Sequence, residues 1–147
     1  MQNRNSKVEN STSASLEQNG LLAEVPGGLN DLACSVYEKN CKKWEYPPTR
    51  NIGEILCLIH SEVSEALEAD RKHKYCHMNA ADMVNRFKDD VFKDEYKTFV
   101  KGTFEEEMAD IFIRLIDLCA YKGVDIEAHV KAKLKFTFMN DTEDKKY

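Results

Sequence analysis

The stretch LIHSEVSEALEADRK, residues 58–72, decides the fold class that this sequence predicts. Together with the residues just before it, it places apolar side chains at helical spacing: Ile52, Ile55, Ile59, Val63, Ala66 and Leu67. Asn51 and Glu54 have the spacing of a capping box, so we expect a helix from there to about Lys72. Glu62 and Glu65 stand one turn apart on that helix, which raises the question of what neutralises them.

A second stretch, EMADIFIRLIDLCAY at residues 107–121, is apolar around most of its circumference and predicts a buried helix. Thr103 and Glu106 have capping-box spacing at its start. Gly123 can adopt the left-handed conformation that commonly ends a helix. Its charged residues follow a single stripe at helical spacing: Glu107, Asp110, Arg114 and Asp117. A charged stripe on an otherwise buried helix faces something polar, and we interpret Arg114 and Asp117 as a buried structural pair.

The rest of the chain also favours helices. The segment LNDLACSVYEKNCKKW predicts a first helix from Leu29, which EYPPTR ends because paired prolines cannot continue a helix. After Lys72 we expect one short helix near residues 80–87 and little regular structure beyond it. Asp125 is expected to cap a last helix that runs to about Phe138. No strand alternation is evident, so the predicted fold is all-α, a bundle of about four to five helices.

Length and composition indicate one domain with two tails. The chain has 147 residues, and residues 1–28 form an Asn/Ser-rich tail that we expect to be disordered. Residues 29–138 form the predicted domain, and residues 139–147 form a polar C-terminal tail. Five cysteines without a CxxC pair are expected to be free thiols in a reducing, cytoplasmic compartment. We find no signal peptide and no apolar run of membrane-spanning length.

The net charge of -5 argues against nucleic acid or a membrane surface as a partner. A polyanionic substrate would need metal ions as intermediaries. The two acidic pairs, Glu62/Glu65 and Glu107/Asp110, could face each other across antiparallel helices. Like charges about 4 Å apart repel by roughly 4 kcal/mol at an effective dielectric of 20, so either divalent cations or basic side chains must neutralise them. Oxygen ligands alone favour Mg²⁺, or Mn²⁺, over zinc, and protein-bound Mg²⁺ commonly binds substrate phosphates.

At these residues the sequence resembles the all-α nucleoside triphosphate pyrophosphohydrolases of the MazG-like group. The signature of that family is ExxE followed by ExxD on a later helix, which reads here EVSE (Glu62, Glu65) and EMAD (Glu107, Asp110). The resemblance covers about Leu29 to Phe138. The chain departs from the family at Ser61, where many members carry an acid, and at Thr137, where Asn is expected, and it lacks the Arg-Pro that follows in relatives.

The resemblance implies Mg²⁺-dependent hydrolysis of NTPs and dNTPs to nucleoside monophosphate and pyrophosphate, as house-cleaning of the nucleotide pool. It implies metal ligation by both acidic pairs, with Glu62 or Glu65 orienting or deprotonating the attacking water. The predicted substrate contacts are Lys133, which matches a recurrent family lysine, with Arg71, Lys72 and Trp44. Trp44 either stacks on a base or anchors the first helix in the core.

The helix at residues 107–121 is apolar around most of its circumference. We therefore expect a second subunit to complete the core, as a homodimer or a dimer of dimers. The resemblance points the same way. Two alternative functions stay open. One is a non-catalytic, homo-oligomeric helical interaction domain in which basic residues such as Arg114 satisfy most of the acids. The other is a phosphoribosyl-ATP pyrophosphohydrolase, which shares the metal chemistry but acts on a different substrate.

Overall fold

The structure, a computed structural model, describes residues 27–140, and within this range the chain forms α-helices and no strand. The six helices are α1 (Leu29–Trp44), α2 (Ile52–Arg71), α3 (Ala80–Arg86), α4 (Asp89–Phe99), α5 (Phe104–Tyr121) and α6 (Ile126–Asn140). The all-α prediction is therefore confirmed for the described residues. The expected N-terminal tail at residues 1–28 and the end of the C-terminal tail, residues 141–147, lie almost wholly outside the described range.

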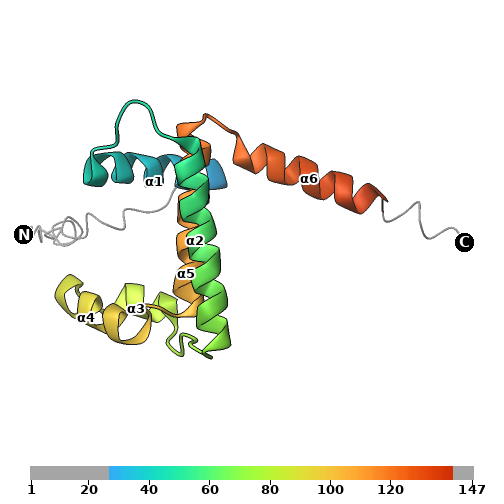
Figure 1. Ribbon diagram of the computed structural model, residues 1–147. Coiled ribbons are helices and arrows are strands. Elements are labelled where there is room, and N and C mark those ends of the chain that lie inside the picture. The colour runs from blue at the N-terminus through green and yellow to red at the C-terminus, as the bar shows by residue number, and fades with distance from the viewer. Residues whose placement is uncertain (1–26, 141–147) are drawn as a thin grey trace, which may run out of the picture.

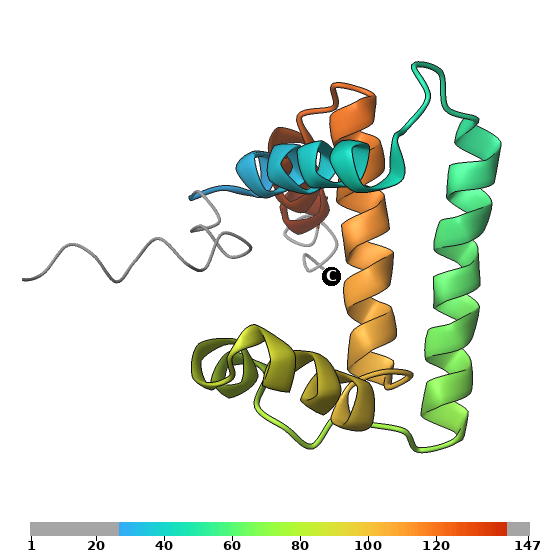
Figure 2. The same ribbon diagram turned by 90° about the vertical axis from the view of Figure 1, so that its left-hand side faces the viewer.

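Two long antiparallel helices, α2 and α5, form the centre of the fold. They lie side by side over most of their length, and Figure 2 shows α1 across one end of α5 and the α3–α4 pair at the other end. In Figure 1, α6 extends away from this centre and has only a small contact with α1. The central helix pair thus carries both acidic motifs on neighbouring helices, as the sequence predicted.

The buried stripe of α2 differs from the expected one. Its buried side chains are Ile55, Glu62, Ala66 and Ala69, which recur at helical spacing and face α5. Val63 and Leu67, expected in the core, are about half exposed. The predicted stripe was therefore wrong on one flank, because small alanines rather than the large apolar residues let α2 approach α5 closely. Glu62 therefore lies within the contact between α2 and α5.

Helix α4 was not predicted. Residues beyond Phe87 were expected to have little regular structure, yet Asp89–Phe99 forms a helix of 11 residues. None of its residues is fully buried, and its mixed charges obscured a narrow apolar side that includes Phe92 and Tyr96, whose rings lie 5.7 Å apart. The bundle therefore has more helices than the four to five expected.

The helix starts follow the capping signals. The Asn51 side chain accepts hydrogen bonds from the backbone N–H groups of Gly53 and Glu54, and the Thr103 hydroxyl accepts one from Glu106. The Glu106 carboxylate in turn accepts from the backbone of Gly102. These caps fix where α2 and α5 begin, and so they fix the positions of the acids one to three turns further along.

The last helix is longer than expected and lies mostly in solvent. Asp125 accepts a hydrogen bond from the Ala128 N–H, as a capping residue does, and α6 then runs to Asn140 rather than to Phe138. Met139 and Asn140, assigned from the sequence to the C-terminal tail, therefore belong to this helix. Within residues 27–140, no helix is both long enough and apolar enough to span a bilayer.

Candidate metal centre and adjoining cavity

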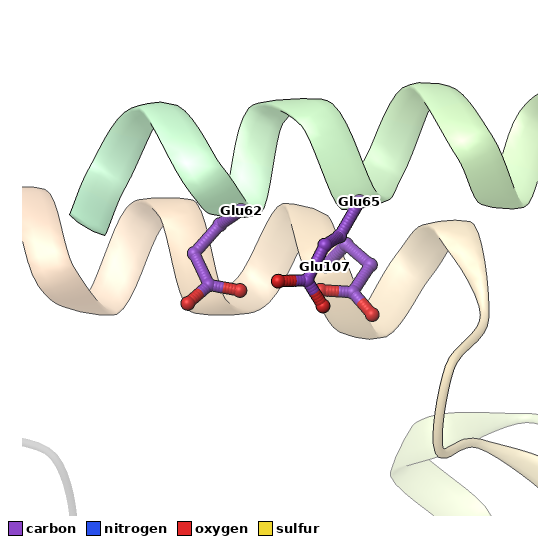
Figure 3. A group of neighbouring side chains, drawn as sticks. All are labelled: Glu62, Glu65 and Glu107. Carbon is purple, nitrogen blue, oxygen red and sulfur yellow. The ribbon is translucent and has the colours of Figure 1, made fainter. Parts of the chain in front are cut away.

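Three carboxylates from the two central helices meet at one point. One oxygen each from Glu62, Glu65 and Glu107 lies within 4.8 Å of the other two, and Figure 3 shows their side chains on the same side of α2 and α5. Glu62 and Glu107 are buried, whereas Glu65 is exposed. Among the described residues this is the group of acids, histidines and cysteines whose spacing suits a metal ion. The cluster unites three of the four predicted ligands.

Helix geometry explains why these residues meet. Glu62 belongs to the buried stripe of α2, and Glu65 lies one turn further along the same helix. Glu107 lies in the first turn of α5, which begins at Phe104 because Thr103 caps it. Since α2 and α5 are antiparallel, the second half of α2 lies against the first half of α5. The ExxE and ExxD motifs therefore face each other.

The cluster is electrostatically strained. Burial, followed by repulsion from the carboxylates of Glu65, Glu106 and Glu62, raises the pKa of Glu107 to about 7. A divalent cation bound here would offset the repulsion among these carboxylates and favour the ionised form of Glu107. The donor set consists only of carboxylate oxygens, which suits Mg²⁺ or Mn²⁺.

Asp110, the fourth predicted ligand, lies beside the three-carboxylate group rather than within it. Burial and the nearby Glu62 carboxylate raise its pKa, while Arg114 acts in the opposite direction. Asp110 also lines the large cavity described below. It therefore lies between the acid cluster and that cavity, one turn along α5 from Glu107.

One acid of the cluster has a basic partner. The Arg114 guanidinium lies 2.7 Å from the Glu62 carboxylate, and the side chains are 41% and 10% exposed respectively. The predicted pairing of Arg114 with Asp117 was therefore wrong, because helix packing brings Glu62 of α2 opposite Arg114. Of the ion pairs among the described residues, this one alone reaches the cluster. Basic side chains thus satisfy one of the acids and not most of them.

A cavity of about 770 Å³ adjoins the cluster. Its walls come from the end of α1, the 45–51 loop, the first half of α2 and the middle of α5. Asp110 and Arg114 lie on the wall that leads to the acids, while Trp44 and Lys43 lie on the α1 side. Its size lies within the range of small-molecule sites.

Asp117 holds the far wall of this cavity together. Its carboxylate accepts hydrogen bonds from Arg50, at 2.8 Å, and from Asn40, at 3.1 Å. The Arg50 guanidinium stacks over Tyr46, 4.0 Å from the ring centroid, and its backbone N–H donates to the Tyr121 hydroxyl. The sequence reading treated EYPPTR only as a helix terminator and missed this role, because the partners of Arg50 lie far away along the chain.

Tyr96 is another residue that the sequence did not single out. Burial and the nearby Glu106 and Asp110 carboxylates raise its pKa to about 12, and its side chain is hydrogen-bonded to Glu106. Tyr96 belongs to α4, so no site role could be assigned while that helix was not expected. The unpredicted helix therefore contributes a side chain close to the acidic motif of α5.

The predicted substrate contacts lie in different places. Trp44 is 61% exposed, lines the cavity and has the Lys43 ammonium 4.6 Å from its ring centroid, so it does not anchor α1 in the core. Arg71 and Lys72 are exposed at the far end of α2, where Lys72 pairs with Glu68. Lys133 is exposed on α6 with its ammonium over Phe136. Of these, the cavity lining includes Trp44 alone.

Comparison with protein-family models, curated proteins and solved structures yields no match for this chain. The resemblance to MazG-like proteins therefore stays a prediction from the two acidic motifs.

Proposed function

We propose that this protein is a Mg²⁺-dependent nucleoside triphosphate pyrophosphohydrolase, which cleaves NTPs or dNTPs between the α- and β-phosphates. The products would be a nucleoside monophosphate and pyrophosphate. The observation that carries the proposal is the meeting of Glu62, Glu65 and Glu107 within 4.8 Å beside a cavity of about 770 Å³. A cluster of carboxylates next to a nucleotide-sized cavity suits metal-assisted chemistry on phosphates.

The charges of the site fit a divalent cation. Three carboxylates converge, and one ion pair, from Arg114 to Glu62, offsets part of their charge. An Mg²⁺ ion held by Glu62, Glu65, Glu107 and Asp110 would add two positive charges among these acids, polarise the phosphates and lower the pKa of a bound water. Mn²⁺ has the same preference for oxygen ligands and would substitute for it.

The protein's own residues have distinct roles in this proposal. Glu65 is the exposed acid of the cluster, and it receives a long hydrogen bond, 3.4 Å, from the Ser61 hydroxyl. Its carboxylate is therefore the one placed to orient the attacking water and accept its proton. Glu62 and Glu107 are buried and serve as fixed ligands. The chain supplies position and electrostatics, which are the main contributions that proteins make to phosphoryl transfer.

The cavity would hold the nucleoside part of the substrate. Trp44 offers an exposed aromatic face on which a base can stack, and Lys43 lies over that ring. With the triphosphate at the Asp110 side, the base would reach the α1 side of the same cavity. The exposed basic residues Arg71, Lys72 and Lys133 lie on other surfaces, and they would contact substrate only in an assembly of several chains.

We further propose that the active form is a homodimer or a dimer of dimers. Helices α2 and α5 each expose a second apolar stripe, with Leu56, Val63 and Leu67 on α2 and Met108, Phe112 and Leu115 on α5. Exposed apolar side chains also run along α6, which has little contact with the rest of the chain. Surfaces of this kind favour association with a second copy.

The experiment that tests the function is product analysis across a panel of NTPs, dNTPs and phosphoribosyl-ATP, with Mg²⁺ and with EDTA. The proposal predicts monophosphate and pyrophosphate from the nucleoside triphosphates, with Mg²⁺ only. Release confined to phosphoribosyl-ATP would favour that relative of the family instead. Absence of any product from a folded protein would favour the non-catalytic interaction domain.

A further inference from the structure

Arg114 occupies an unusual position among the charges of the site. It lies on α5 between Asp110 and Asp117, yet its partner is Glu62, across the helix contact on α2. Glu62 is at the same time a member of the carboxylate group that suits a metal ion. The guanidinium and a bound cation would therefore draw on the same carboxylate.

Arg114 and a bound divalent cation would compete for the Glu62 carboxylate. A divalent cation among Glu62, Glu65 and Glu107 would sit within a few ångströms of the guanidinium that now lies 2.7 Å from Glu62. Two positive charges so close repel each other, and the single negative charge of the Glu62 carboxylate can balance only one positive charge. Binding of the cation therefore weakens the hold of Glu62 on Arg114.

The Arg114 guanidinium can move from Glu62 into the adjoining cavity. Its side chain is 41% exposed, against 10% for Glu62, so the guanidinium end of the pair is the one that can move. Arg114 also lines the cavity of about 770 Å³, next to Asp110 and on the wall nearest the acids. A phosphate chain seated at that wall would present negative oxygens to the planar guanidinium, a geometry that arginine binds with paired hydrogen bonds.

We propose that Arg114 is an exchangeable counter-ion: it neutralises Glu62 until a divalent cation binds there, and then transfers to the phosphates of the substrate. This inference rests on the proposed function, because it needs both the cation and a phosphate-bearing ligand. It assigns the phosphate contact to a residue of the acidic stripe itself. It also makes binding of cation and phosphate mutually supportive, since each favours the displaced position of Arg114.

The test uses Mn²⁺ alone and then Mg²⁺ with tripolyphosphate, a probe that has phosphates and no base. Arg114→Gln removes the counter-ion. Arg86→Gln is the matched control, because it removes an equal charge from an exposed ion pair with Asp82 outside the cavity. Mn²⁺ affinity is measured by loss of the free-ion electron paramagnetic resonance signal. Tripolyphosphate affinity at saturating Mg²⁺ is measured by the fluorescence of Trp44, the single tryptophan, which lines the cavity.

We expect Arg114→Gln to bind Mn²⁺ about tenfold more tightly and tripolyphosphate about tenfold more weakly, the change that one charged hydrogen-bonded contact commonly makes. Arg86→Gln should change neither affinity. Equal affinities in the two variants, or weaker Mn²⁺ binding in Arg114→Gln, would overturn the inference while leaving the metal site intact. A wild-type protein that binds no Mn²⁺ would overturn the proposed function and this inference together.

Arg114→Lys covers the case in which Arg114→Gln does not fold. Lysine keeps the positive charge opposite Glu62 and so preserves the link between α2 and α5, but it cannot form the paired hydrogen bonds of a guanidinium. We expect this variant to hold tripolyphosphate about threefold more weakly than the wild type. Wild-type tripolyphosphate affinity in Arg114→Lys would show that the paired hydrogen bonds of the guanidinium do not hold the phosphates, and it would overturn the inference.

Discussion

The roles proposed for the acids differ because their surroundings differ. Glu62 and Glu107 are buried in the contact between α2 and α5, while Glu65 reaches solvent from the same cluster. Buried carboxylates are held in place by packing and suit the role of ligand. The exposed one keeps access to water, which the proposed hydrolysis consumes. The division of labour therefore follows from burial and not from residue type.

Replacing Glu65 with glutamine tests this division. The amide is nearly isosteric but cannot take a proton, so we expect the fold to persist and the rate of pyrophosphate release to fall by at least about 100-fold. Glu68→Gln is the matched control, because Glu68 lies one turn further along α2 and pairs with Lys72 in solvent. Steady-state rates with Mg²⁺ compare the two. Wild-type turnover in Glu65→Gln would remove Glu65 from the chemistry.

The pH dependence of stability tests the environment of Glu107. Its pKa is raised from 4.5 to about 7, chiefly by burial and then by the neighbouring acids. Between those values the folded protein keeps a proton that the unfolded chain has lost, so without divalent cations the stability must fall as pH rises through this window. We expect Tm in EDTA to decrease from pH 5 to 7.5, and Glu107→Gln to flatten that decrease. Parallel curves of Tm against pH for the wild type and Glu107→Gln would contradict a raised pKa of Glu107.

At the residue scale, the sequence predicted the acids better than their partners. Spacing along a helix places Glu62 beside Glu65, and the same rule applies to Glu107 and Asp110. Pairing between helices depends on how α2 is rotated against α5, which one-dimensional spacing does not contain. For that reason the Arg114–Glu62 and Arg50–Asp117 pairs were missed, and Arg114 was assigned to the wrong acid.

At the scale of elements, the caps set the register of the site. Thr103 accepts a hydrogen bond from the Glu106 N–H, and Gly102 adopts a left-handed conformation with φ 74° just before it. The first turn of α5 then carries Glu107 into the cluster. Loss of the cap would loosen the very turn that holds this carboxylate.

Thr103→Ala removes the hydroxyl and should lower the free energy of unfolding by about 1 kcal/mol, as loss of an N-cap commonly does. Thr98→Ala is the control, since the Thr98 hydroxyl, in the last turn of α4, donates to the Asp94 carbonyl of the same helix, and its loss should change stability by no more than about 0.5 kcal/mol. Urea unfolding followed by circular dichroism measures both. Equal stability of Thr103→Ala and the wild type would show that the cap does not hold α5.

The elements that the sequence predicted are those with strong periodicity or clear caps. Helices α2 and α5 have both, and their expected bounds agree with the structure to within a residue or two. Helix α4 has no cap signal, since Lys88 forms no side-chain cap, and its apolar residues Phe92, Tyr96 and Phe99 recur at helical spacing but stand among many charges. Its place is fixed by contacts that lie outside the helix, such as that of Tyr96 with Glu106. Contacts of that kind leave no local pattern.

At the scale of the whole molecule, large apolar side chains remain exposed on both central helices. The second stripe of α2, with Leu56, Val63 and Leu67, lies beside the buried one, about 100° around the helix. A second copy covering it would bury these side chains at about 25 cal/mol per Å² of apolar surface. The dimer proposal therefore belongs to the same helices that carry the acids.

Sedimentation equilibrium tests the dimer, with Val63→Glu as the disrupting variant. We expect the wild type to be a dimer or a tetramer, and Val63→Glu to weaken association by at least about 100-fold because a charge would be buried without a partner. Val91→Glu is the matched control, since Val91 on α4 is 50% exposed and Val63 is 47% exposed. A monomeric wild type would contradict the proposal, and an intact dimer in Val63→Glu would exclude this stripe from the interface.

The central claim, that the carboxylates of α2 and α5 hold a divalent cation for nucleotide cleavage, is tested most directly by one crystal structure. The crystals would contain Mn²⁺ and a dNTP analogue with a non-hydrolysable α,β-methylene link, and the anomalous difference map would locate the metal. We predict anomalous density among Glu62, Glu65, Glu107 and Asp110, with the analogue's phosphates beside it. Anomalous density elsewhere, or none with the nucleotide bound, would contradict the account.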